Sequence, residues 1–175
     1  MANNILKDKD NNILDPKIPR YEKLVDYTLD ASTDEINIST LKIKAGDNFQ
    51  VLIDGGLDNT TEDYENVRCY PNSKSTFTVA RVIGVENRNN VVSSILNGNT
   101  DGFYIGRSDK NANFLAITQI SWQGSYLKGN CTYGSSSIAG FLNSLVDFSD
   151  EMLTTLKIKT NSGTFRAGTK IKIYK

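Results

Sequence analysis

The chain has 175 residues, carries 20 Lys and Arg against 20 Asp and Glu, and contains no histidine. Its length suits one domain that can bury enough surface to fold without a disulfide or a structural metal. The balanced charge argues against a protein that binds nucleic acid mainly through phosphate contacts. The lack of histidine excludes the Ser-His-Asp and Cys-His catalytic arrangements and removes the commonest metal ligand.

The two cysteines, Cys69 and Cys131, lack a CxxC spacing and are too few for a disulfide framework. We therefore expect reduced thiols in a chain that is made in a cytoplasm. Residues 1–9 have no apolar core of signal-peptide length, and no stretch approaches about 18 apolar residues. We expect no signal peptide, no membrane insertion, no metal and no cofactor.

Residues 1–26 differ from the rest of the chain, since two short apolar pairs flank a polar run and two prolines follow. The prolines favour an extended path. Such a segment is too small to form its own core, so we predict an N-terminal attachment arm over 1–26 and a single body over 27–175. The arm would lie against its own body, a neighbouring subunit or a larger assembly. Its candidate anchoring residues are Ile5, Leu6, Ile13, Leu14, Pro16, Ile18 and Pro19.

The first part of the body shows short alternating runs. Alternation of apolar and polar residues predicts strands over 35–39, 41–45 and 49–54, ended by the glycines at 46 and 55–56. Residues 58–75 are polar and predict a loop with one strand near 67–70. A further strand is predicted over 76–84, followed by a turn at 87–90.

The second part continues in the same manner. Residues 91–96 suit a strand or a single helical turn, and strands are predicted over 102–106 and 114–122 around a loop at 108–113. Glycine, asparagine and serine make 128–137 turn-rich. Residues 138–145 suit a short helix, and the run 152–159 returns to strand.

The closing stretch, 153–175, predicts two strands and a turn. Leu156 and Ile158, and later Ile171 and Ile173, alternate with lysines, as in strands with one buried and one solvent-exposed face. The pentapeptide TLKIK occurs at 40–44 and again at 155–159, which suggests two strands in equivalent surroundings. Together these patterns predict an all-β protein, either a sandwich or a barrel of antiparallel strands. The periodicity of the sequence does not show which strands pair with one another.

Charge is unevenly distributed along the body. Residues 30–65 contain nine acids and two lysines, whereas 157–175 contain six bases and no acid. The two segments would be neighbours in one sheet, would meet across a subunit contact, or would each form a solvated surface.

Few residues suggest catalysis or metal binding. The run 8–12 matches the first ligand positions of a calcium loop, but Ile13 replaces the required glycine and Pro19 the bidentate glutamate, so we interpret it as a polar turn. Ser135–Ser137 lack a GxSxG context and predict a loop. Two groups of acids lie in loops, where carboxylates are mostly solvated, and we expect no catalytic pair among them. These acids are Glu62, Asp63, Glu65, Asp147, Asp150 and Glu151.

Aromatic residues are the remaining candidates for a binding site. Trp122, Tyr126 and Tyr133 lie in a segment rich in glycine and serine, where a sugar could stack on an exposed ring. The alternative, which we favour for Trp122, is that this residue ends a core strand and fills the sandwich. An exposed tyrosine would equally suit a subunit interface.

Both ends of the chain resemble a known group of proteins. The run 155–175, with Phe165, the Ala167-Gly168-Thr169 turn and the final strand Lys170–Tyr174, is similar to the closing strands of jelly-roll domains in tailed-bacteriophage virion proteins. Such domains occur in tail fibres, head fibres and baseplate or receptor-binding components. The runs 45–55 and 4–19 are similar to their early strands and N-terminal attachment segments. The middle departs from the pattern, since only 97–99 and the following Phe103-Tyr104 match it.

The resemblance implies a jelly-roll-like antiparallel β-sandwich with an extended N-terminal arm. It implies a virion structural protein, an appendage anchored by its arm to capsid, neck or tail proteins, commonly as a homotrimer, and assembled in the host cytoplasm. No catalytic residues come with it, so we expect no enzyme. The alternative hypothesis is a carbohydrate-binding module that recognises host cell-surface glycans, and a glycosidase is the least favoured.

Overall fold

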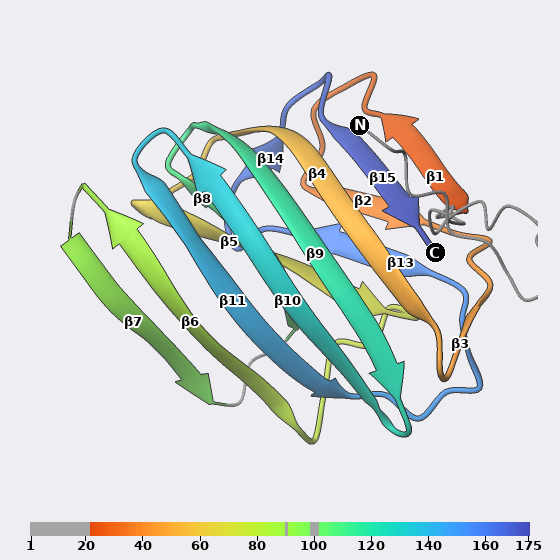
Figure 1. Cartoon of the computed structure of the whole chain (residues 1–175). Helices are drawn as coiled ribbons and strands as arrows, with labels where there is room; N and C mark the ends of the chain where they lie inside the picture. The colour runs from red at the N-terminus through yellow and green to blue at the C-terminus, as the bar shows by residue number, and fades with distance from the viewer. Residues whose placement is uncertain (1–21, 90, 99–101) are drawn as a thin grey trace, which may run out of the picture.

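The computed structural model describes residues 22–89, 91–98 and 102–175, and every regular element in these ranges is a β-strand. All strand pairs are antiparallel, and two sheets lie face to face with the apolar core between them (Figure 1). The all-β, antiparallel sandwich predicted from the sequence is therefore confirmed. The arm residues from Ile5 to Pro19 lie outside the described ranges.

The larger sheet has nine strands. In order across the sheet these are β1 (Lys23–Thr28), β15 (Lys170–Tyr174), β4 (Asn48–Asp58), β9 (Asn113–Gln123), β10 (Tyr126–Ser135), β11 (Ile138–Asp147), β6 (Ala80–Arg88) and β7 (Val91–Gly98), with the short β14 (Thr164–Phe165) beside β4. Strands β9, β10 and β11 follow one another along the chain through tight turns, so their registers are continuous. The centre of this sheet is thus a three-strand meander, to which β4 adds on one side.

The smaller sheet has four strands, in the order β2 (Glu35–Ile38), β13 (Leu156–Lys159), β5 (Tyr64–Pro71) and β8 (Phe103–Asp109). A two-stranded piece, β3 (Ile43–Lys44) with β12 (Met152–Leu153), lies beyond its end. Consecutive strands thus change sheet repeatedly, which the local pattern of apolar residues does not reveal.

Strand β8 joins the two layers. All seven of its residues are buried, because it pairs with β5 at the edge of the small sheet and also packs on β9, β10 and β11. Inner-face hydroxyls of the large sheet donate to its backbone: Thr118 Oγ1 to the Ile105 carbonyl at 2.8 Å, and Ser144 Oγ to the Tyr104 carbonyl at 3.1 Å. A buried ion pair adds to this contact, with Arg107 Nη1 2.9 Å from Glu86 Oε2.

The glycine pair predicted to end a strand lies inside one instead. Strand β4 runs through Gly55 and Gly56 to Asp58. A Cβ on Gly55 would lie 2.3 Å from Thr169 Oγ1, and one on Gly56 would lie 2.8 Å from the Arg166 side chain. The glycines let the turn between β14 and β15 pack closely on β4, which is a common role of glycine within a strand.

Two further predictions for the centre of the chain are wrong. Residues 128–135 lie in β10 and only 136 and 137 lie in a turn, while 138–145 belong to β11 and not to a helix. Gly129 faces inward, and a Cβ there would lie 2.5 Å from Phe103 Cζ, so this glycine admits a core ring. In β11 the inward positions between Ile138, Leu142 and Val146 are Gly140 and Ser144. This leaves large apolar residues four apart, which imitates a helical pattern.

Several boundaries also move. Lys23–Asp26, assigned to the arm, belong to β1, which pairs with β15. Strand β5 is longer than the single short strand predicted near 67–70, β6 begins at Ala80 rather than at 76, and 91–98 form a strand. Residues 108 and 109 continue β8, so the loop before β9 is only a tight turn.

The closing stretch contains the two predicted longer strands, but they lie in different sheets. β13 pairs with β2 and β5 in the small sheet, whereas β15 pairs with β1 and β4 in the large one. The two copies of TLKIK are not equivalent: in the early copy only Ile43 and Lys44 are in a strand, and they pair with β12. The apolar residues of both copies are buried, so the repeat reflects a shared inward face and not a duplicated position.

The oppositely charged segments are neighbours, which was one of the three alternatives. Lys170 lies directly opposite Asp54, and Lys159 lies opposite Glu35. Arg166 Nη2 approaches Asp58 Oδ1 at 2.7 Å, and Lys175 Nζ approaches Asp47 Oδ2 at 2.7 Å. Opposite charges on neighbouring strands each contribute a fraction of a kcal/mol, about 0.2–1, to sheet pairing.

Replacing Trp122 by Ala is expected to lower the free energy of unfolding by about 3–5 kcal/mol, because the ring is 1% exposed and packs edge-to-face on Phe148 at 4.9 Å. Urea unfolding followed by far-UV circular dichroism measures this. The matched control is Tyr126→Ala, whose ring is 41% exposed and should cost well under half as much. Equal costs for the two variants would contradict this account of the core.

Candidate functional site

The three aromatic residues singled out as a sugar platform do not form one surface. Trp122 and Tyr133 are buried on the inner face of the large sheet, and only Tyr126 is exposed. Trp122 Nε1 donates to the Gly124 carbonyl at 3.0 Å, and Tyr133 Oη donates to Glu86 Oε2 at 3.1 Å. As favoured in the sequence analysis, Trp122 fills the core. The predicted cluster is therefore wrong, because alternation along β9 and β10 turns two of its three rings inward.

Three of the six acidic residues considered for catalysis, Glu65, Asp147 and Asp150, have structural partners. Glu65 is fully buried and accepts hydrogen bonds from the Asn161 and Ser162 backbone N–H groups at 3.0 and 3.3 Å, and from the Ser162 hydroxyl. Asp147 Oδ1 accepts from the Val79 N–H at 2.9 Å, and Asp150 pairs with Lys74 at 2.5 Å. These carboxylates fasten loops to strands.

The serine run also has a structural partner. Asp109 Oδ2 accepts from Ser135 Oγ at 2.6 Å and from the Ser137 N–H at 2.7 Å, while Oδ1 accepts from Ser137 Oγ at 2.8 Å. Ser136 Oγ adds a contact at 3.1 Å. Burial alone would raise the pKa of Asp109, but the hydrogen bonds from Ser135, Ser137 and Ser136 outweigh it and hold the pKa below its ordinary value. This carboxylate fixes the turn between β10 and β11.

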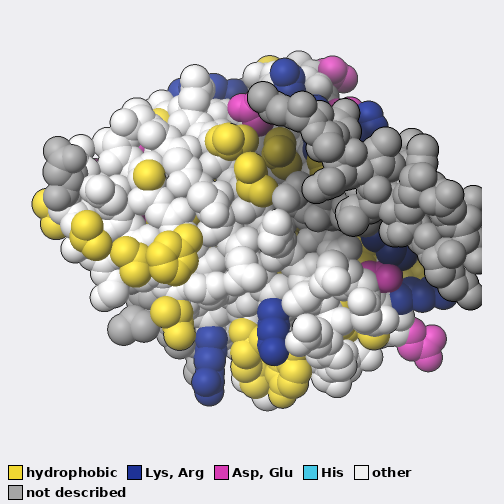
Figure 2. Space-filling view, in the orientation of Figure 1, with side chains coloured by type: hydrophobic (Ala, Val, Ile, Leu, Met, Phe, Trp, Pro, Cys, Tyr) yellow, Lys and Arg dark blue, Asp and Glu magenta, His cyan; other side chains and the backbone are white. Residues whose placement is uncertain are grey.

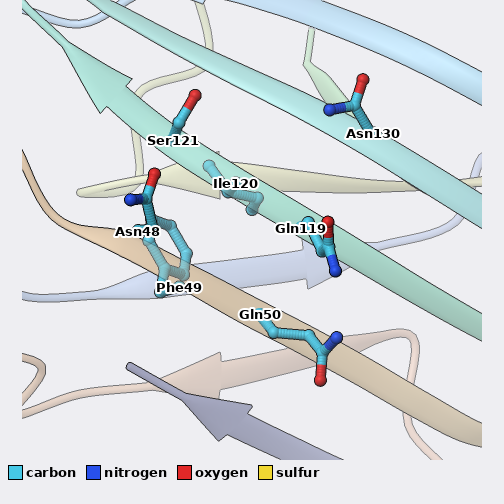
Figure 3. A pocket seen from close by; sticks show the side chains of 7 residues that line it. All are labelled: Asn48, Phe49, Gln50, Gln119, Ile120, Ser121 and Asn130. Atoms are coloured by element: carbon cyan, nitrogen blue, oxygen red, sulfur yellow. The ribbon is translucent and has the colours of Figure 1, made fainter. Parts of the chain in front are cut away.

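A polar groove crosses the outer face of the large sheet. It has a volume of about 330 Å³ and lies over β4, β9 and β10 (Figure 3). We call it the amide groove. Its polar lining residues are Asn48, Gln50, Gln119, Ser121 and Asn130. They come from every second position of their strands, and the residues between them, Phe49 and Ile120, are buried in the core.

Strand register sets the geometry of the amide groove. Gln50 lies directly opposite Gln119, which in turn lies directly opposite Asn130, so three side-chain amides form a row across three strands. Asn48 and Ser121 are opposite one another in the next outward-facing row. Side chains in such positions have Cβ atoms about 4.5–5.5 Å apart, close enough to act on one ligand together.

Aromatic residues flank the amide groove on the same face. Tyr174, on β15, lies directly opposite Gln50 and is half-buried, so its ring lies beside the end of the amide row. Phe141, on β11, is 48% exposed and lies opposite Thr132 of β10. Neither was singled out from the sequence. Each follows the outward alternation of its strand, which becomes informative only when the neighbouring strands are known.

The amide groove can bind hydroxyl groups without doing acid–base chemistry. A side-chain amide offers both a carbonyl acceptor and an N–H₂ donor, which suits adjacent hydroxyls that donate and accept in turn. None of the described residues that line the groove has a titratable side chain. Where Figure 2 shows described residues, this face has few charged side chains and scattered hydrophobic ones. Among the described residues no group of three or more Cys, Asp or Glu is arranged to hold a metal ion.

Comparison of the chain with protein-family models, with curated protein sequences and with solved structures gives no match. In residues 22–89, 91–98 and 102–175, no helix has the length and hydropathy needed to cross a membrane.

Replacing Asp109 by Asn is expected to lower stability at neutral pH by about 1–3 kcal/mol, since a charged acceptor of several partly buried hydrogen bonds is lost. The pKa of Asp109 is lower in the folded state than the unfolded value of about 3.9. Its contribution is therefore complete above that value and is lost as the pH falls through the folded-state pKa. In urea unfolding between pH 2 and 7, the free energy of unfolding should fall more steeply on acidification in the wild type than in the variant. Parallel curves would contradict this role.

Proposed function

We propose that the protein is a non-catalytic carbohydrate-binding β-sandwich that holds a neutral sugar in the amide groove. The observation that carries this proposal is the row of amides formed by Gln50, Gln119 and Asn130 across three paired strands. A rigid sheet holds these groups in place, so little conformational entropy is lost when a ligand binds. Their donor and acceptor chemistry matches the hydroxyls of a saccharide.

The flanking aromatic residue supports the choice of ligand. A pyranose has apolar C–H faces as well as hydroxyls, and an aromatic ring accepts such a face. Tyr174 is beside Gln50 in register and can meet the sugar face while the amides meet its hydroxyl edge. The groove volume of about 330 Å³ lies at the lower end of ligand sites, about 300–1,000 Å³, which suits one or two sugar rings.

The setting that we propose is a tailed-bacteriophage virion. It rests on the resemblance of 4–19 and 155–175 to the attachment segments and closing strands of phage appendage proteins. In this proposal residues 1–19 attach the protein to capsid, neck or tail proteins, the body is a jelly roll, and the appendage is a homotrimer assembled in the bacterial cytoplasm. The groove would then bind host surface glycans, so the two proposals describe one role.

Sugar binding is tested with a glycan array and then by titration calorimetry with the oligosaccharide that binds best. The double variant Gln119→Ala/Asn130→Ala should lose at least about tenfold in affinity, because each lost hydrogen bond costs about 0.5–1.5 kcal/mol. The matched control is Asn87→Ala, an exposed amide on β6 of the same sheet, which should bind normally. Failure of the intact protein to bind any glycan, or unchanged binding by the double variant, would refute the proposal.

Virion attachment is tested by deleting residues 1–19 and producing particles with the truncated protein. The expected result is a soluble, folded body that is absent from purified particles, because the apolar and proline residues of the arm are gone. Negative-stain images with antibody against the body locate the intact protein on the particle. Normal incorporation of the truncated protein would contradict the anchoring role, and absence of the intact protein from particles would contradict the virion setting.

A further inference from the structure

A second hollow lies on the opposite side of the molecule, on the outer face of the small sheet. It has a volume of about 520 Å³. We call it the basic pocket. Its lining residues are Arg68, Tyr70, Ser75, Lys157, Lys159, Thr160 and Asn161. Three of the seven carry a positive charge and none carries a negative charge. The amide groove, in contrast, has an uncharged lining.

The lysines of the basic pocket differ from a similar pair in the large sheet. In β15, Lys170 lies directly opposite Asp54 and Lys172 lies directly opposite Asp26, so each faces a carboxylate. In β13, Lys157 lies between Asn37 and Tyr70. Strand β13 repeats the alternation of β15, but its two lysines have one carboxylate, Glu35, directly opposite them where the β15 lysines have two.

Two positive charges are placed directly opposite one another in the basic pocket. Lys159 is opposite Arg68 of β5 on one side and Glu35 of β2 on the other. Lys157 and Lys159 both lie on the outward side of β13, and two ammonium groups placed on one face attract an anion.

One carboxylate is shared between the two lysines. Glu35 Oε2 is 3.6 Å from Lys159 Nζ and 3.9 Å from Lys157 Nζ, longer than a hydrogen bond of good geometry. The other oxygen, Oε1, accepts from Asn37 Nδ2 at 2.8 Å. Each ammonium group has three N–H donors, so Glu35 leaves most of their hydrogen-bonding capacity for a ligand.

The rim of the basic pocket is firmly held and carries an aromatic ring. The Asn161 N–H donates to the buried Glu65 at 3.0 Å, which fixes the turn that forms one wall. Lys157 Nζ lies 5.9 Å from the centroid of the Tyr70 ring, and the Arg68 guanidinium lies 5.1 Å from the centroid of the Tyr104 ring. Cations held over rings on a rigid sheet keep their positions, which favours a ligand that combines an oxyanion with an apolar face.

We propose that the basic pocket binds an acidic saccharide, with Lys157 and Lys159 on its oxyanion and Tyr70 against its sugar ring. The inference extends the proposed carbohydrate binding, but it concerns the other sheet and a different sugar chemistry. A carboxylate of a uronic acid and a phosphate of a polyol-phosphate polymer offer the same oxygen chemistry. The two are separated by experiment.

The test is titration calorimetry of the full-length protein with three probes: an oligogalacturonate, a glycerol-phosphate oligomer and a neutral oligosaccharide. At least one acidic probe should bind, and its affinity should fall steeply between about 50 and 500 mM salt, because exposed charges are screened. Lys157→Gln/Lys159→Gln should weaken this binding at least about tenfold, through loss of charge-assisted hydrogen bonds. The charge-matched control Lys170→Gln/Lys172→Gln should bind within about twofold of wild type, and circular dichroism confirms that both variants are folded.

The results of this experiment can be told apart from those of the sugar-binding test of the amide groove. Binding of one acidic probe only would support the proposal and identify its oxyanion. No binding of either acidic probe, or equal loss in both lysine variants, would overturn it, since the second result shows a general charge effect. The groove variant Gln119→Ala/Asn130→Ala should leave acidic binding intact, so a failure of the neutral-sugar proposal does not decide the acidic one.

Discussion

The close seating of strand β8 on the inner face of the large sheet is the constraint on which the rest of the sandwich depends. The facing positions must be small or hydroxylated: Gly129 makes room for the Phe103 ring, and Thr118 and Ser144 bond the β8 carbonyls. These contacts satisfy backbone groups at a sheet edge that would otherwise be buried without partners. They also hold β9 and β10 in place from the inner side of the large sheet. The outer side of these two strands forms part of the amide groove.

The outer faces of the two sheets have different chemistry. On the large sheet the amide groove presents uncharged amides with a tyrosine beside them, whereas on the small sheet the basic pocket presents cations close to tyrosine rings. The inner residues cannot vary in this way because they must fill one dry core. Function in such a fold therefore depends on the outward half of each strand. Among the acids considered for catalysis, Glu65 and Asp147 fasten loops instead.

Several features of the fold could be predicted because they depend on local pattern. Alternation identified most strands, and the burial of Trp122 followed from its place at the end of one. The predictions failed where a contact between distant segments replaced a local preference. Gly55 and Gly56 are in a strand because Thr169 and Arg166 need the space, and β11 resembles a helix because Gly140 and Ser144 occupy inward positions. The candidate sugar platform failed likewise, since its rings were chosen by proximity in sequence and not by the face of the sheet.

By itself, the sequence determined that this protein is an all-β protein of antiparallel strands, because period-2 alternation and turn residues act within a few positions of one another. It also supplied the opposite charges of the early and closing segments. Tertiary structure alone decided which strands are neighbours, and hence that Gln50, Gln119 and Asn130 form a row and that Lys159 faces Arg68. The physical reason is that register is set by long-range backbone pairing and core filling, which bring together residues far apart in the chain.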